Sequence, residues 1–326
     1  MAGPLQIFAL GATGEFGGAV ARAINEPLAR HEERVFEDGE YKLRPLDVVA
    51  GSDVYVIQSL HAGPNLSADD KLNRLLFFIG TLKDCGAARV TAVAPYLCYA
   101  RKDRRTKWQD PLTLSYVARL FEAAGTDAVV TLDVHNEVAF ENAFRCRTIA
   151  LTAAPLVRAY ASAIGDEPLC VISPDPGGVK RAQLFREALE AARGHPIARG
   201  FVDKRRSAGK VETGVFVGDA KGATALIIDD LIASGGTMVR AARAALEQGA
   251  KRVIAFAAHG LFTEGAAEAL ADPALDRVAV TDTVPGFRLP EGPARRKLEV
   301  LPATHLFGDA IRRLHGHRSL EDLNVF

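Results

Sequence analysis

The sequence predicts an α/β fold built on parallel sheets. Short β-branched runs alternate along the chain with longer Ala-, Leu- and Arg-rich stretches, and this alternation is typical of parallel strands joined by helices. Charged and glycine-rich segments follow several of the apolar runs directly, at the carboxyl ends of strands, where ligands bind in such folds. A segment beginning at Gly86 recurs at Gly249, which predicts two copies of one α/β unit.

The predicted elements follow one another in chain order. The first strand lies in the segment MAGPLQIFAL, which has no basic region and turns at once into Gly11, so we interpret it as a strand and not as a signal peptide. Strands are expected in the short apolar runs Gln6–Leu10, Asp53–Gln58, Arg89–Ala94, Ala128–Leu132, Leu169–Ser173, Ala225–Asp229 and Arg252–Ala257. Helices are expected in longer stretches that include Phe16–Asn25, Lys71–Cys85, Leu112–Ala123, Lys180–Ala192 and Thr237–Gln248.

The internal repeat indicates where the chain divides. Gly86–Ala94 matches Gly249–Ala257 at a constant offset of 163 residues, half of the 326-residue chain. Upstream, Asp53–Ile57 parallels Thr224–Ile228, and each is followed by a loop, a helix and the Gly-Ala segment. The alternative is that Gly-Ala-x-Arg-Val is only a common helix-to-strand turn. We expect one domain over residues 1–150 and a second over 151–304, with residues 305–326 packing back on the first.

Composition excludes several classes of protein. Forty Lys and Arg balance forty Asp and Glu, so the formal net charge is zero, which argues against a dedicated nucleic-acid or membrane-surface binder. Hydrophobic residues make up 48% of the chain, yet no run approaches the roughly 18 apolar residues of a membrane helix. The cysteines (Cys85, Cys98, Cys146 and Cys170) have no CxxC or Cys/His spacing. We therefore expect buried thiols in a reducing, cytoplasmic compartment, and neither a zinc site nor a redox pair.

The strongest chemical signal lies in Leu226–Thr237. There a buried strand is predicted to end in Asp229 and Asp230, followed by a Gly-Gly turn and the start of a helix. The turn and the helix N-terminus can offer several backbone N–H groups to a phosphate, and Thr237 adds a hydroxyl. Two carboxylates beside a phosphate site fit a sugar phosphate, because carboxylates accept hydrogen bonds from ribose hydroxyls. The alternative is that the acidic pair serves only as a turn and N-cap.

A second glycine-rich segment points elsewhere. Gly11–Gly17 follows a predicted strand and reads GxxGxxG, like some dinucleotide-binding loops. Asp38 lies downstream where a ribose-binding acid would be expected, but no clear hydrophobic strand precedes it, so a nicotinamide site is not favoured. No GxxxxGK[ST] sequence occurs, and an ATP site here would not be of the P-loop type.

Six segments, in chain order, resemble the ribose-phosphate diphosphokinase (PRPP synthetase) family. Leu226–Thr237 is similar to the phosphoribosyl-diphosphate loop that this family shares with phosphoribosyltransferases. The other five are similar to the adenine loop, the ATP-phosphate segment, the magnesium site, the ribose and metal loop and the catalytic segment: Phe36–Glu40, Tyr99–Arg105, Asp133–His135, Ser173–Gly178 and Asp203–Arg206. The resemblance covers nearly the whole chain and implies two tandem phosphoribosyltransferase-like domains, the first binding ATP and the second ribose 5-phosphate.

The resemblance also implies a reaction and its residues. The diphosphoryl group of Mg-ATP would pass to the 1-hydroxyl of ribose 5-phosphate, giving 5-phosphoribosyl 1-diphosphate and AMP. The implied ATP-binding residues are Phe36, Asp38, Gly39, Glu40, Arg101, Lys102, Asp103 and Arg104. Those for ribose 5-phosphate are Arg206, Asp229, Asp230, Ala233, Ser234, Gly235, Gly236 and Thr237. The implied magnesium ligands are His135, Asp175 and Asp133, and the implied catalytic residues are Lys204 and Arg206.

The residue types suit these roles. Arg101–Lys107 holds five cationic side chains in seven residues, and arginine binds phosphate oxygens in pairs; a solvated charge run is the alternative. Asp175 is a better ligand for Mg²⁺ than His135, because Mg²⁺ prefers oxygen. Phe36 fits either a core aromatic or, beside its acidic, glycine-containing turn, an exposed adenine platform.

The chain departs from the family pattern at a few positions. Ala233-Ser234 stands where the family has an acidic residue followed by Thr, which removes a carboxylate but keeps the backbone donors. Lys102 replaces a Gln, and Asp69–Cys85 matches poorly the helix near the family's allosteric phosphate/ADP site. Two alternatives remain: a weakened homologue that acts as a regulatory partner, and a phosphoribosyltransferase, which would not need Arg101–Arg105. The resemblance further implies a homo-oligomer, built on dimers and up to a hexamer, with the ATP site at a subunit interface.

Overall fold

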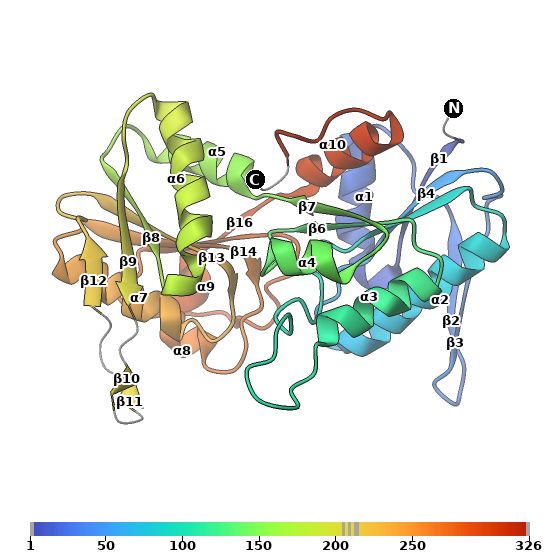
Figure 1. Cartoon of the computed structure of the whole chain (residues 1–326), viewed down its shortest axis with the longest axis horizontal. Coiled ribbons are helices and arrows are strands. Elements are labelled where there is room, and N and C mark those ends of the chain that lie inside the picture. The colour runs from blue at the N-terminus through green and yellow to red at the C-terminus, as the bar shows by residue number, and fades with distance from the viewer. Residues whose placement is uncertain (1–2, 204–205, 208–209, 212–214, 324–326) are drawn as a thin grey trace. The chain divides into compact units, whose positions relative to one another are not determined.

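The chain divides into two compact units. The computed structural model describes residues 3–203, 206–207, 210–211 and 215–323. Unit 1 contains Met1–Thr152 and Ala303–Val325, and unit 2 is built from Ala153–Pro302. Because the chain leaves unit 1 and later returns to it, unit 2 is an insertion in unit 1 (Figure 1).

Unit 1 is a parallel sheet covered by helices. Its described residues form a five-stranded sheet in the order β1-β4-β5-β6-β7, with every neighbouring pair parallel. The strands are β1 (Leu5–Ala9), β4 (Asp53–Ile57), β5 (Arg89–Val93), β6 (Ala128–Leu132) and β7 (Arg147–Leu151). The helices are α1 (Gly14–Ala23), α2 (Ala68–Asp84), α3 (Thr113–Ala123), α4 (Glu137–Ala143) and α10 (Thr304–His315). An antiparallel hairpin of β2 (His31–Val35) and β3 (Tyr41–Pro45) extends from this unit (Figure 1).

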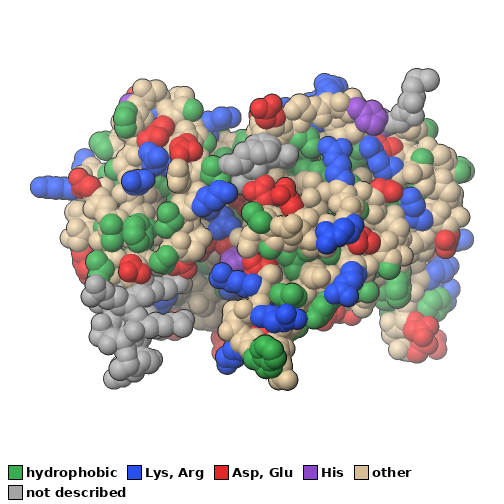
Figure 2. Space-filling model, in the orientation of Figure 1, with side chains coloured by type: hydrophobic (Ala, Val, Ile, Leu, Met, Phe, Trp, Pro, Cys, Tyr) green, Lys and Arg blue, Asp and Glu red, His purple; other side chains and the backbone are tan. Residues whose placement is uncertain are grey.

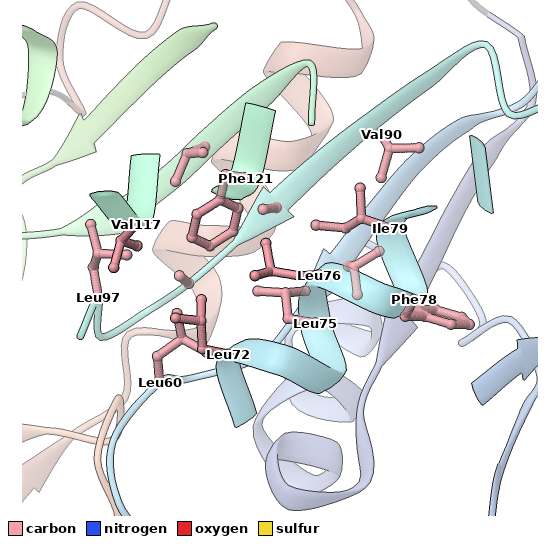
Figure 3. Close-up of a cluster of buried hydrophobic side chains, with 14 of the residues drawn as sticks. Leu60, Leu72, Leu75, Leu76, Phe78, Ile79, Val90, Leu97, Val117 and Phe121 are labelled. Atoms are coloured by element: carbon pink, nitrogen blue, oxygen red, sulfur yellow. The ribbon is translucent and has the colours of Figure 1, made fainter. Parts of the chain in front are cut away.

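Helices α2 and α3 cover one face of this sheet. Helix α2 starts at a capping box, in which Ser67 and Asp70 exchange side-chain and backbone hydrogen bonds. Its apolar positions recur every three or four residues, so one face of the helix is buried against the sheet. Figure 3 shows Leu72, Leu76 and Ile79 of α2 gathered in one cluster with Phe121 of α3.

The opposite face is covered by α1 and by α10, which comes from the end of the chain. The rings of Phe16 and Phe307 meet edge to face at 5.6 Å. At the start of β4, the buried Asp53 accepts two hydrogen bonds from Arg89 and contacts Nδ1 of His315 at 2.8 Å. These contacts tie the C-terminal helix to the amino ends of two strands that are distant in sequence.

Unit 2 repeats this architecture with two additional strands at one edge. Among its described residues, the sheet order is β12-β9-β8-β13-β14-β15-β16, with β12 antiparallel to β9 and the other pairs parallel. The strands are β8 (Leu169–Ser173), β9 (Ala198–Asp203), β12 (Val215–Gly218), β13 (Thr224–Ile232), β14 (Arg252–Gly260), β15 (Arg277–Thr281) and β16 (Leu298–Leu301). The helices are α5 (Ala154–Ile164), α6 (Val179–Arg193), α7 (Gly236–Glu247), α8 (Ala266–Leu270) and α9 (Pro293–Lys297). A short hairpin, β10 (Arg206–Ser207) and β11 (Lys210–Val211), lies between β9 and β12 in sequence.

The sequence repeat is a repeat of structure. Strands β8, β13, β14, β15 and β16 follow the same order as β1, β4, β5, β6 and β7. The turn before the repeated strand is the same in detail, because Gly51 N–H donates to Gly86 O and Gly222 N–H donates to Gly249 O, both at 2.8 Å. The fold is therefore α/β with two parallel-rich units, as predicted.

Some predicted boundaries were wrong. Strands β13 and β14 run on to Ile232 and Gly260, beyond the predicted Asp229 and Ala257, because their carboxyl ends keep pairing with one another. The cysteines are all free, and Cys98 and Cys170 are buried as expected. Cys146 is only half-buried, and Cys85 is exposed because it follows the last turn of α2. No helix in the described part of the chain is long and apolar enough to cross a membrane.

Candidate functional site

The carboxyl edge of the unit 2 sheet presents the segment that the sequence singles out. Strand β13 carries Asp229 and Asp230, and α7 starts four residues after the strand ends. Gly235 is the N-cap of α7 with φ +77°, a left-handed conformation that favours glycine, and an added Cβ would lie 2.9 Å from Leu270. Ser234 is exposed, and the first turn of α7 is free of acidic residues. This geometry suits an anion held by the N-terminus of α7.

The two carboxylates are held by an arginine from a different element. Arg181, in the first turn of α6, places Nη1 3.6 Å from Asp229 Oδ1 and 3.6 Å from Asp230 Oδ1. Burial, with the neighbouring Asp230, raises the pKa of Asp229 to about 7, and Arg181 opposes this rise. Asp229 therefore gives up its proton less readily than an exposed aspartate does.

A second loop at the same edge follows β8. Asp175 accepts hydrogen bonds from the N–H groups of Gly177 and Gly178 at 3.0 and 3.2 Å, while Ser173 donates its hydroxyl to the carbonyl of Asp175 at 2.6 Å. Because β8 and β13 are parallel neighbours, this loop and the carboxylate pair lie at the same edge of one sheet. Arg181 follows the loop directly in sequence and connects it to β13.

One buried polar residue at this edge was not among the site residues predicted from the sequence. His259, 3% exposed, lies in β14 beside Leu231 of β13, and its Nδ1 is 2.8 Å from the hydroxyl of Thr283. A polar residue near the end of an apolar run was a usable signal for His259. For Arg181 there was none, because one arginine among the charged residues of a helix looks like a surface residue.

The predicted ATP-phosphate segment is an exposed loop of unit 1. Arg101, Lys102 and Arg104 are exposed, and Figure 2 shows Lys and Arg side chains gathered over the loop that projects from this unit. The loop is anchored at its start by Tyr99, whose hydroxyl donates to Asp69 Oδ1 at 2.5 Å. Tyr99 itself has φ +60°, an uncommon conformation for a bulky residue, at the point where the loop begins.

This loop is connected to the predicted magnesium segment. Asn136 donates its side-chain amide to Asp103 Oδ2 at 2.7 Å and caps α4 through its other side-chain atom. Asp133 is buried at the end of β6 with φ +36°, and His135 beyond it is exposed. The structure thus brings the segments from residue 101 and from residue 133 together at the carboxyl edge of unit 1.

The predicted adenine loop is the tip of the β2–β3 hairpin. Phe36 is 40% exposed and lies under the guanidinium of Arg34 at 5.1 Å. Gly39 has φ +90°, and Asp38 accepts the N–H of Glu40 at 3.0 Å. The core-aromatic alternative for Phe36 was therefore wrong, because its ring is open to solvent.

The remaining predicted residues are the catalytic pair and the magnesium ligands. Lys204 lies outside the described residues, and Arg206 is the first residue of β10. Asp133 and His135 belong to unit 1, and Asp175 belongs to unit 2. Within the described part of the chain, no three His, Cys, Asp or Glu side chains are grouped as a metal site. A closed protein cage is thus not formed there, whereas Mg²⁺ commonly takes one or two carboxylates, several waters and substrate phosphates.

Comparisons with known proteins agree along the whole chain. Residues 5–125 match the model for the N-terminal domain of ribose phosphate pyrophosphokinase, and residues 204–324 match the phosphoribosyl synthetase-associated domain. The ribose-phosphate pyrophosphokinase of Caldanaerobacter subterraneus subsp. tengcongensis is 38% identical over 322 residues, covering 98% of this chain and 97% of the relative. That of Hyphomonas neptunium is 36% identical over 321 residues, covering 98% and 99%.

A solved structure gives the same result in three dimensions. The crystal structure of phosphoribosylpyrophosphate synthetase from Mycobacterium smegmatis superposes with a TM-score of 0.84 at 32% identity, covering 96% of this chain and 99% of that one. Similarity in sequence and in fold thus extends through both units and through the segments described above. The chain belongs to the ribose-phosphate pyrophosphokinase (diphosphokinase) family.

Proposed function

We propose that this protein is an active ribose-phosphate diphosphokinase, which transfers the diphosphoryl group of ATP to the 1-hydroxyl of ribose 5-phosphate. The observation that carries the proposal is the edge of unit 2, where a carboxylate pair on β13 is followed by the start of α7, which has a glycine N-cap and no acidic residue in its first turn. Full-length relatives with this name support an enzyme over a regulatory partner. The exposed cationic loop from Arg101 is not needed by a simple phosphoribosyltransferase.

The two units have different roles in this proposal. In unit 1, Phe36, Asp38, Gly39 and Glu40 would hold the adenosine part of ATP, and Arg101, Lys102, Asp103 and Arg104 its phosphates. In unit 2, Asp229 and Asp230 would accept hydrogen bonds from ribose hydroxyls, and residues 233–237 would hold the 5-phosphate. Arg206 would contact the sugar phosphate and, with Lys204, the transferred group. ATP is the co-substrate, and the product feeds nucleotide biosynthesis.

The chemistry is an in-line displacement. The O1 atom of the sugar bonds to the β-phosphorus while the bond from that phosphorus to the oxygen bridging it to the α-phosphorus breaks, and AMP leaves with that oxygen. The sugar hydroxyl gives up its proton in the same step, and that proton passes to solvent water. Catalysis then consists of holding O1 in line and neutralising the charge on the transferred group.

Each unit offers residue types that suit magnesium. Asp133 and Asp175 are carboxylates at the carboxyl ends of β6 and β8, the oxygen ligands that Mg²⁺ prefers, and His135 is the third proposed ligand. Bound Mg²⁺ would neutralise phosphate charge. We further propose a cytoplasmic homo-oligomer, built on dimers and up to a hexamer, in which the ATP site lies at a subunit interface.

The test is incubation with Mg-ATP and ribose 5-phosphate while AMP is measured. We expect AMP to form only when the sugar is present, whereas a simple kinase would give ADP. Lys204→Ala should lower turnover by at least about 10³-fold while circular dichroism stays unchanged, and Lys221→Ala, an exposed lysine of unit 2, should leave turnover as it is. Absence of sugar-dependent AMP from the unmodified protein, or near-normal turnover of Lys204→Ala, would contradict the proposal.

A further inference from the structure

The acidic pair on β13 lies in surroundings that disfavour its negative charge. Asp229 and Asp230 are adjacent, and their side chains are only 21% and 6% exposed. Two carboxylates so close and so little hydrated repel each other, and burial disfavours the charged form of each. A protonated carboxyl group accepts hydrogen bonds from sugar hydroxyls less well than a carboxylate, so the charge state of the pair matters for binding.

We propose, on the basis of the function above, that Arg181 is the positioning residue of this pair: its guanidinium holds both carboxylates in place and sets the pH range over which the site binds sugar. One atom, Nη1, lies at the same 3.6 Å from Oδ1 of Asp229 and from Oδ1 of Asp230. The Arg181 side chain is 17% exposed, so its charge is screened less by water than that of a surface ion pair.

The position of Arg181 in the fold supports this role. It lies in the first turn of α6, which begins directly after the Asp175–Gly178 loop, and it reaches across to the neighbouring strand β13. The loop after β8 and the acidic pair are thus linked by one side chain. A cation at the N-terminal end of a helix opposes the helix dipole, and the ion pairs with the two carboxylates offset that cost.

Other titratable or charged groups near this end of β13 have contacts of their own. The elements packed against β13 contribute His259 from β14, Arg240 from α7 and Asp175 before α6. Arg240 is exposed and donates to the hydroxyl of Thr237 at 3.0 Å, and Asp175 accepts backbone N–H groups within its own loop. Arg181 is the side chain that the salt bridges connect to both carboxylates.

The test measures ribose 5-phosphate binding to the intact chain by calorimetry between pH 5 and pH 9. Arg181→Gln should raise the pH midpoint of binding by about 1 unit or more, because loss of a nearby cation raises the pKa of carboxyl groups. It should also raise the KM for ribose 5-phosphate about tenfold at pH 7 and leave the KM for ATP unchanged. Arg181→Lys should restore the midpoint, because it keeps the charge, while binding remains weaker.

Arg186→Gln is the matched control, because Arg186 lies on the same helix and pairs with Glu190 at 2.6 Å, away from the acidic pair. It should leave the midpoint where it is. If the unmodified protein binds ribose 5-phosphate and Arg181→Gln binds it with the same pH midpoint, this inference alone is overturned. If the unmodified protein binds no ribose 5-phosphate at any pH, the proposed function is overturned and the inference with it. If Arg181→Gln does not fold, Arg181→Lys decides, and an affinity equal to that of the unmodified protein would refute the positioning role.

Discussion

At the scale of the single residue, the sugar binding proposed for Asp229 conflicts with the stability of the fold. Its carboxyl group is ordinarily ionised above a pKa of 3.8, but burial and the neighbouring Asp230 raise that pKa to about 7 in the folded protein. Between these two values the folded chain binds more protons than the unfolded chain, so stability falls as the pH rises through this window. The ionised carboxylate, which is the form proposed to accept a hydrogen bond from a ribose hydroxyl, is thus the form that lowers the stability of the fold.

We therefore expect Asp229→Asn to stabilise the protein at pH 8 by a few kcal/mol, since each pKa unit corresponds to about 1.4 kcal/mol, and to give little advantage at pH 4. The same variant should lose most of its affinity for ribose 5-phosphate. Urea unfolding followed by circular dichroism at several pH values measures the first effect, and calorimetry the second.

Asp272 provides a control of the opposite sign. Hydrogen bonding from the N–H of Ala274, together with Arg243, lowers the pKa of Asp272 below its usual value despite the opposing effect of burial. Its ionised form stabilises the fold above the unfolded pKa, and this contribution is lost as the pH falls through the folded pKa. Asp272→Asn should therefore destabilise unit 2 at pH 8, and equal slopes of stability against pH for the two variants would contradict the account of Asp229.

At the scale of the element, the return of α10 onto unit 1 depends on close contact with α1. Gly308 of α10 has no room for a side chain, because an added Cβ would lie 3.0 Å from Cγ2 of Ile24 and 3.2 Å from the carbonyl oxygen of Val20. Gly80 of α2 is also a helical glycine, but nothing lies within 4 Å of an added Cβ there. The two glycines therefore separate crowding from helix propensity.

Gly80→Ala should stabilise the protein by about 0.5–1 kcal/mol, the difference in helix propensity. Gly308→Ala should destabilise it by about 1–3 kcal/mol through overpacking, and limited proteolysis should cleave the C-terminal segment sooner. The midpoints of urea unfolding measure both changes. Stabilisation of similar size by both substitutions would show that α10 does not pack closely on α1.

How far the sequence predicted these elements depended on burial. Strands buried on both faces, such as β4 and β6, form continuous apolar runs, and their carboxyl ends identified the candidate site. The β2–β3 hairpin was not predicted, because strand β2, with the sequence HEERV, is polar and has no buried residue. Arg181 was not predicted as a site residue, because its ion pairs are with β13, some 48 residues later in the chain. A single sequence does not reveal which distant strand a helix will face.

At the scale of the whole molecule, neutrality conceals a division of charge between segments. The formal net charge is zero, yet the loop from Arg101 to Lys107 in unit 1 is cationic, and the edge of unit 2 carries the acidic pair. The first suits a polyphosphate and the second a polyhydroxylated sugar. Because the same strand order serves both units, the proposed difference in ligand arises from the loops and not from the sheets.

This division makes a prediction about the isolated unit 2. Residues 153–302 have their own sheet and hydrophobic core, and an inserted domain of this kind is expected to fold alone. Expressed by itself, the segment should give the circular dichroism of an α/β protein and bind ribose 5-phosphate with a midpoint near that of the full chain. It should not bind ATP and should form no AMP, because the cationic loop and the β2–β3 hairpin are missing.

The full chain carrying Asp229→Asn is the reciprocal variant, since it should keep ATP binding and lose ribose 5-phosphate binding. A folded unit 2 that binds ATP, or that fails to bind ribose 5-phosphate while the full chain does, would show that the ligands are not divided between the units in this way.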